Sequence, residues 1–172
     1  PLPCFAPQTV QLSRLYAAYA KWVGSRLFYC SLKNGKCNMT ECNERTWIGL
    51  DVGKKTFAAA IDMTAHGQRQ KITSIPCREF ARTTAGVDDL FTWVDKMAPG
   101  CPVSIVMETT GCYSQHLTDW INRSRPSVPV TIENARALHA YLQSLNLPHK
   151  TDKLDAQAIA RFGSERCPKA TA

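Results

Sequence analysis

The 172-residue sequence has no long apolar run. No window approaches the ~18 uninterrupted apolar residues that a membrane-spanning helix needs. The first residues, PLPCFAPQ, also lack the basic-then-apolar order of a secretory signal peptide. These absences disfavour a membrane protein and predict a soluble, cytoplasmic one. Hydrophobic residues nevertheless make up 44% of the chain, which is enough for the core of one domain.

Closely spaced cysteine pairs are scarce, although the chain has eight cysteines. Only Cys37 and Cys42 approach the spacing of zinc ligands, and no second close pair completes a site. A zinc site or a disulfide framework is therefore disfavoured, and ordinary reduced thiols are expected.

Acidic residues are missing from the first 38 positions, which hold five basic residues. The rest of the chain has sixteen basic and fourteen acidic residues, so most of the formal charge of +7 belongs to this first segment. Bulk charge is therefore a weak argument for a nucleic-acid partner. Individual motifs have to decide the function.

The chain changes character near residue 46. Turn-forming residues break the pattern just before this point, and Met39 stands a few residues ahead of the first strong strand, as an initiator does. Residues 1–45 are therefore predicted to be an upstream or extension segment outside the core, with a genuine helical arm as the alternative. Residues 46–166 are predicted to form the domain, and residues 167–172 a short tail.

From residue 46 onward, turn residues separate short apolar segments at regular intervals. The pattern predicts strands at 46–53, 56–63 and 71–76, then a helix in TTAGVDDLFTWVDKM capped by Thr83 or Thr84, a strand at 102–109, a helix in YSQHLTDWINRS, a strand in VPVTIE, a helix in ARALHAYLQSL and a last helix in KTDKLDAQAIARFG. Three antiparallel strands followed by alternating helices and strands is the order of the ribonuclease H-like α/β fold, a mixed sheet flanked by helices.

Four carboxylates fall near strand ends and helix starts, where α/β sheets place their sites. Asp51 is near the end of the first strand, and Glu108 is at the end of the fourth. Asp152 and Asp155 lie three residues apart at the start of the last helix, on one face. Each acid alone has a structural alternative as a turn former, a solvated strand end or a partner of the helix dipole.

Taken together, the four acids favour a metal site. Carboxylates that converge repel one another and need cations. An all-oxygen ligand set favours Mg²⁺ or Mn²⁺, and two such ions about 3.5 to 4 Å apart clamp the attacking and leaving oxygens of a phosphodiester.

Five motifs carry a resemblance to a known family: WIGLDVGKKTF, FARTTAG, VMETTGCY, ENAR and KTDKLDA. Their order and spacing resemble those of the DEDD transposases of insertion sequences, in the family called one-ten, over residues 46 to about 166. The resemblance implies a domain similar to the junction resolvase RuvC, with Asp51, Glu108, Asp152 and Asp155 as its catalytic and metal-binding tetrad. It also implies strand cleavage and transfer in DNA transposition, guided by a structured RNA that pairs with donor and target DNA.

Two features depart from this family. Arg82 stands where the family usually has asparagine. Family members also continue through a helical segment into a second domain with a nucleophilic serine, and no serine of this chain can be assigned that role. The chain is therefore expected to be the amino-terminal part of a prokaryotic, nucleoid-associated transposase, to form homo-oligomers through the missing region, and to be inactive in full recombination.

Basic residues beside the acids are expected to contact nucleic-acid phosphates, with a solvated basic surface as the alternative. Lys54 and Lys55 follow Asp51, while Lys150 and Lys153 flank the acid pair.

Three other functions stay open. GLDVGKKTFAAAI also resembles the first phosphate loop of sugar kinases and actin-like ATPases, although no further glycine-rich loop is visible. A standalone RuvC-like junction nuclease and a non-catalytic nucleic-acid-binding remnant are the other two.

Overall fold

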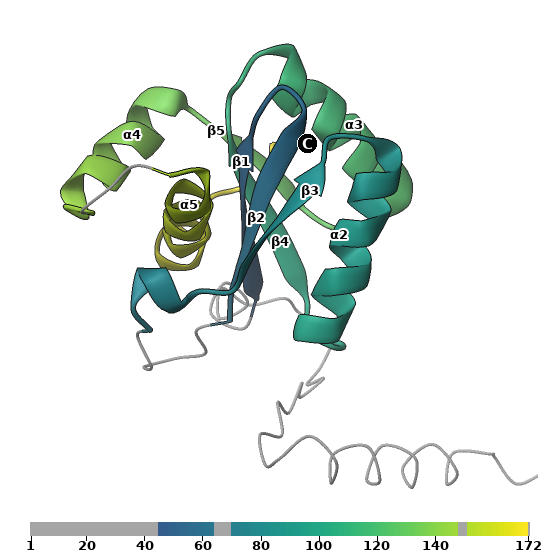
Figure 1. The fold of residues 1–172 in the computed structure, drawn as a ribbon, viewed down its shortest axis with the longest axis horizontal. Coiled ribbons are helices and arrows are strands. Elements are labelled where there is room, and N and C mark those ends of the chain that lie inside the picture. Colours follow the sequence, from purple (N-terminus) through teal and green to yellow (C-terminus); the bar gives the residue numbers. More distant parts are fainter. Residues whose placement is uncertain (1–44, 64–69, 148–150, 172) are drawn as a thin grey trace, which may run out of the picture. The chain divides into compact units, whose positions relative to one another are not determined.

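The chain forms a five-stranded mixed sheet with helices on both faces (Figure 1). The computed structural model describes residues 45–63, 70–147 and 151–171, all within one compact unit. In chain order the elements are β1 (Thr46–Val52), β2 (Thr56–Asp62), the 3-10 helix η2 (Ile72–Ser74), β3 (Cys77–Ala81), α2 (Thr84–Met97), β4 (Val103–Glu108), α3 (Cys112–Ser124), β5 (Val130–Glu133), α4 (Ala135–Ser144) and α5 (Asp152–Arg166).

The strands are ordered β3-β2-β1-β4-β5 across the sheet. β1, β2 and β3 are antiparallel neighbours, whereas β4 runs parallel to β1 and β5 runs parallel to β4. A short turn joins the antiparallel strands β1 and β2, whereas the helices α2 and α3 lead into the parallel strands β4 and β5. The ribonuclease H-like fold that the sequence predicted is thereby confirmed.

The predicted strand at 71–76 is wrong. This segment contains the 3-10 helix η2, and the third strand is Cys77–Ala81. Ile72 and Ile75 are three residues apart, a spacing that suits a 3-10 turn rather than the period of two of a strand. Pro76 has no N–H for a strand ladder. β3 is an edge strand with mostly exposed side chains, so its apolar pattern is weak.

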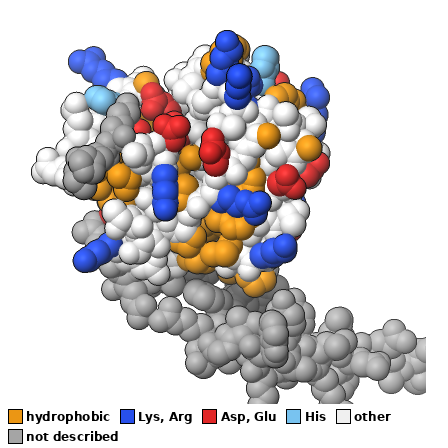
Figure 2. Space-filling model, viewed as in Figure 1, with side chains coloured by type: hydrophobic (Ala, Val, Ile, Leu, Met, Phe, Trp, Pro, Cys, Tyr) orange, Lys and Arg blue, Asp and Glu red, His pale blue; other side chains and the backbone are white. Residues whose placement is uncertain are grey.

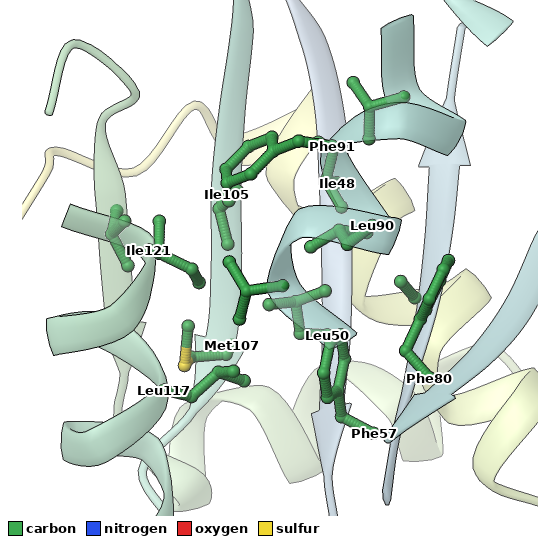
Figure 3. Packing of buried hydrophobic residues seen from close by; sticks show 14 of the residues in the cluster. Ile48, Leu50, Phe57, Phe80, Leu90, Phe91, Ile105, Met107, Leu117 and Ile121 are labelled. Atoms are coloured by element: carbon green, nitrogen blue, oxygen red, sulfur yellow. The ribbon is translucent and has the colours of Figure 1, made fainter. Parts of the chain in front are cut away.

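Helices α2 and α3 cover one face of the sheet. Val87, Leu90, Phe91 and Val94 repeat at helical spacing on α2, and all four are buried. The side chain of Thr83 caps this helix, because its hydroxyl accepts a hydrogen bond from the N–H of Gly86 at 3.1 Å. Figure 3 shows this layer, in which α2 and α3 side chains meet those of β1, β2, β3 and β4.

Helix α5 lies on the opposite face and approaches β1 closely. A Cβ atom added at Gly49 would stand 2.1 Å from the backbone nitrogen of Ala160 and 2.4 Å from the carbonyl oxygen of Ala156. At Gly163 it would meet the ring of Trp47 at 2.6 Å. Only glycine on the strand and small residues on the helix allow this distance, so the contact sets the position of α5.

A buried ion pair fixes the other end of α5. The Nε of Arg161 donates to Asp62 Oδ2 at 2.8 Å, and neither side chain is more than 5% exposed. The Ser164 hydroxyl donates to the same oxygen at 2.9 Å, and a terminal nitrogen of Arg161 donates to the carbonyl of Gln70 at 2.9 Å. These added hydrogen bonds offset the cost of removing the two charges from water.

The residues after α5 run beside β5. The N–H of Thr171 donates to the carbonyl of Val130 at 3.0 Å, and its hydroxyl accepts from the N–H of Ile132 at 2.8 Å.

The division of the chain at 45 and 166 stays a prediction. In the part of the chain that the structure describes, no helix combines the length and apolar character needed to cross a bilayer.

Candidate active site

A pocket of about 290 Å³ opens at the end of the sheet where β1 and β4 finish. All four predicted carboxylates line it. The lining residues are Asp51, Gly53, Thr56, Phe57, Ala58, Glu79, Glu108, Asp152 and Asp155.

The strands bring Asp51 and Glu108 together. Because β1 and β4 are parallel, their carboxyl ends lie at the same edge of the sheet. Leu50 pairs with Met107 in the register, and the two acids are the next residues on the two strands. Both carboxylates are partly buried.

The contact between α5 and β1 brings the other two acids to the same place. Gly49 and Asp51 are two residues apart on β1 and therefore share a face. Ala156 approaches Gly49, and Asp152 lies one helical turn before Ala156 on α5. Asp152 and Asp155 occupy the first turn of this helix, whose start is capped by the Thr151 hydroxyl accepting from the N–H of Leu154 at 3.2 Å.

Glu79 is a fifth acid of the pocket, and the sequence did not predict it. The register pairs Asp51 with Ala58 and Ala58 with Glu79, so the three residues lie in one row across β1, β2 and β3. The signal was available, because an alternating strand through residue 79 would have placed its side chain on the face of Asp51. The misplaced third strand hid it.

Basic groups surround the acids unevenly. Lys54 and Lys55, in the β1–β2 turn, and Lys153, on α5, are exposed. Lys150 lies outside the described residues. Figure 2 shows acidic side chains in the upper middle of this face, with Lys and Arg side chains set around them.

The pKa of the Cys77 thiol is affected by charged groups near the pocket. Burial raises the pKa of Cys77 to about 11, while the charge of Lys153 lowers it and the charge of Asp51 raises it. The described cysteines, which are Cys77, Cys101, Cys112 and Cys167, are free thiols.

The donor set has the chemistry of a hard-cation site, since every charged ligand in the pocket is a carboxylate. Within residues 45–63, 70–147 and 151–171, however, no three His, Cys, Asp or Glu side chains stand where one ion would be held.

Comparison with known proteins identifies the family. Residues 48–170 match the sequence profile of the DEDD transposases of the IS110 type, described as transposase. The chain belongs to this family. Two curated relatives, the pilin gene-inverting proteins of Moraxella bovis and Moraxella lacunata, are 32% and 31% identical to it over 125 residues. That alignment covers 72% of this chain and 36% of each relative, so the chain spans about a third of their length.

Solved structures give weaker similarities to this IS110-type chain. Thermus thermophilus RuvC has a TM-score of 0.47 at 11% identity, covering 73% of this chain and 98% of RuvC. Fowlpox virus resolvase in complex with Holliday junction DNA has a TM-score of 0.41 at 16% identity, covering 72% of this chain and 99% of the resolvase. Similarity at this level says nothing of what this chain binds.

Proposed function

We propose that residues 46–166 form the amino-terminal catalytic domain of an insertion-sequence transposase that cleaves and transfers DNA strands with divalent metal ions. The observation that carries the proposal is the convergence of Asp51, Glu108, Asp152 and Asp155 on one pocket, from three separate elements, in a chain of the DEDD transposase family. The curated relatives are named for inverting a pilin gene, which is a rearrangement of DNA.

The four carboxylates are the proposed ligands of two Mg²⁺ or Mn²⁺ ions. When bound, such ions supply positive charge that stabilises the attacking and leaving oxygens of a phosphodiester. The chain's own contribution is to hold the acids on rigid elements. The strand ends fix Asp51 and Glu108, and the close contact at Gly49 fixes the first turn of α5.

Basic residues near the pocket are proposed to bind the DNA backbone. Lys54, Lys55 and Lys153 are exposed next to the acids and can meet phosphates on either side of the cleaved bond. Lys150 is proposed for the same role. The partners of the whole protein are proposed to be donor DNA, target DNA and a structured guide RNA, with a homo-oligomer as the working form in the prokaryotic cytoplasm, associated with the nucleoid.

Metal titration tests the tetrad. Asp51→Asn and Asp152→Asn are each expected to weaken Mn²⁺ binding in a calorimetric titration, because each removes one charged ligand. Both variants are expected to stay folded, since each removes a carboxylate that repels its neighbours when no metal is bound. A matched control is Asp89→Asn, which changes an exposed acid on α2, away from the pocket. Unchanged Mn²⁺ affinity in both pocket variants would contradict the proposed tetrad.

A recombination assay separates the alternatives. The purified chain would be incubated with Mg²⁺, guide RNA and paired donor and target DNA. Slow nicking without joined product is expected, because strand transfer needs a nucleophile that conserves the phosphodiester energy and the tetrad alone supports hydrolysis. Joined product from these 172 residues would refute the need for a separate nucleophile-bearing region. Selective cleavage of four-way junctions would favour a standalone junction nuclease.

A further inference from the structure

Arg82 is held in place by three contacts at the end of the sheet that carries the pocket. It lies between β3 and the start of α2. Its backbone N–H donates to the carbonyl of Lys55 at 2.8 Å, and its side-chain Nε donates to the carbonyl of Lys54 at 2.9 Å. Its guanidinium carbon lies 4.6 Å from the centre of the Tyr113 ring, within the range of a cation–π contact.

These contacts join two segments that adjoin lining residues of the pocket. Lys54 and Lys55 form the turn between Gly53 and Thr56, which are both lining residues. Tyr113 lies in the first turn of α3, shortly after Glu108. The β1–β2 turn stands at the top of the sheet in Figure 1, at the end where β4 finishes. The guanidinium therefore lies at the same end of the sheet as the pocket, on the side of α3 rather than among the acids.

The contacts leave part of the guanidinium available. Only Nε hydrogen-bonds to the described protein, so the two terminal nitrogens can still donate to a ligand. A fork of two such nitrogens matches the oxygens of a phosphate. Because the stack on Tyr113 and the bond to Lys54 already restrict the side chain, less rotamer freedom is lost on binding than for an exposed lysine.

We propose that Arg82 binds a backbone phosphate of the DNA strand that enters the pocket, next to the phosphate that is cleaved. The pocket carries five acids, which repel the polyanionic DNA strand. A fixed positive charge near these acids can hold one phosphate and thereby position the DNA strand relative to the pocket. This inference rests on the proposed function, because it takes DNA as the substrate.

The test compares variants in the full 172-residue chain. Arg82→Gln removes the charge and the fork. Arg78→Gln is the matched control, because Arg78 is exposed on β3, four residues before Arg82, and also lies over an aromatic ring, that of Phe80, at 5.2 Å. Affinity for a fluorescein-labelled single-stranded DNA is measured by anisotropy across a salt series at constant Mn²⁺, and Mn²⁺ affinity is measured separately.

Loss of one phosphate contact has a defined signature. Arg82→Gln is expected to weaken DNA binding about tenfold, as for a hydrogen bond to a charged group. The slope of log affinity against log salt should fall by about 0.7 for a single strand. Mn²⁺ affinity should not change, and Arg78→Gln should alter the DNA measurements by less than half as much. Arg82→Lys should restore the salt slope, because the charge returns, but only part of the affinity.

Other outcomes overturn the inference. Equal effects of Arg82→Gln and Arg78→Gln would show that Arg82 is merely one of many surface charges, while the proposed function would stand. A fall in Mn²⁺ affinity that accompanies the fall in DNA affinity of Arg82→Gln would show that Arg82 stabilises the structure of the pocket and does not bind DNA. Wild-type protein without salt-dependent DNA binding would refute the proposed function and this inference together.

A second variant covers the case in which Arg82→Gln does not fold. Tyr113→Leu removes the aromatic ring on which the Arg82 guanidinium stacks but keeps the arginine charge. DNA affinity should then fall while the salt slope stays as in the wild type, because the contact becomes less ordered without losing its charge. Wild-type affinity in Tyr113→Leu would contradict the role given to the stack.

Discussion

Gly49→Ala tests the contact that builds the pocket. The added methyl would overlap the backbone nitrogen of Ala160 at 2.1 Å and the carbonyl oxygen of Ala156 at 2.4 Å. Neither atom can rotate away, because both belong to the backbone of α5. The helix must therefore move outward from β1, and the buried residues around the contact lose packing.

The expected cost lies at the upper end of the range for overpacked cores. Such substitutions cost typically 1–3 kcal/mol, so we expect a loss of about 3 kcal/mol in the free energy of unfolding. For a domain of this size that corresponds to a fall in Tm of roughly 10 °C. Mn²⁺ affinity should fall as well, because the displaced helix carries Asp152 and Asp155.

Gly163→Ala is the matched control for this substitution. Its added methyl would meet side-chain atoms, at 2.6 Å from the Trp47 ring and 2.9 Å from Val106. Side chains can shift, and alanine gains up to about 1 kcal/mol in helix propensity over glycine. We therefore expect a smaller loss of stability than for Gly49→Ala. Thermal and urea denaturation measure both variants, and a Gly49→Ala protein with wild-type Tm and Mn²⁺ affinity would refute the close-contact argument.

Three further predictions concern stability. Asp62→Asn should lower the free energy of unfolding by about 3–5 kcal/mol in urea denaturation, because it leaves the buried Arg161 without its counter-charge. The double variant Asp62→Asn/Arg161→Met should recover part of this loss. Equal stability of the single and the double variant would contradict the argument from the unpaired charge. Because burial raises the pKa of Cys77 to about 11, stability should be intact below the ordinary value of 9.0 and fall as pH rises toward 11. Replacing Cys77 with alanine should reduce that fall, as measured by denaturation at several pH values, and an unchanged profile would exclude this thiol as a cause. Deleting residues 1–38 should change Tm little, since the described strands begin at Thr46, and a large drop would place that segment in the core.

Local patterns were sufficient for most of the elements. Alternating or continuous apolar residues identified β1, β2, β4 and β5, and helical spacing identified α2. The third strand was missed because an edge strand buries little, so CREFA lacks the apolar signal of the inner strands. Pro76 and the spacing of the two isoleucines were local signals against the strand predicted there.

The candidate site was predicted in part. The four acids of the proposed tetrad, which line one pocket, were located because strand ends and helix starts can be identified from sequence and because their motifs resemble a known family. Glu79 and Arg82 were not found as parts of the site. Their positions depend on the register of β3 with β2 and on a stack against Tyr113, and neither is a property of the local sequence.

The sequence by itself determined the family, the order of strands and helices, and the acids that belong at element ends. These properties follow from side-chain types and their spacing along one segment. Only the tertiary structure decided that α5 meets β1 at backbone contact and that five acids share one pocket with an arginine fixed beside it. The physical reason is that such distances depend on atoms from residues far apart in the chain, and their packing is specified by the whole core rather than by any one segment.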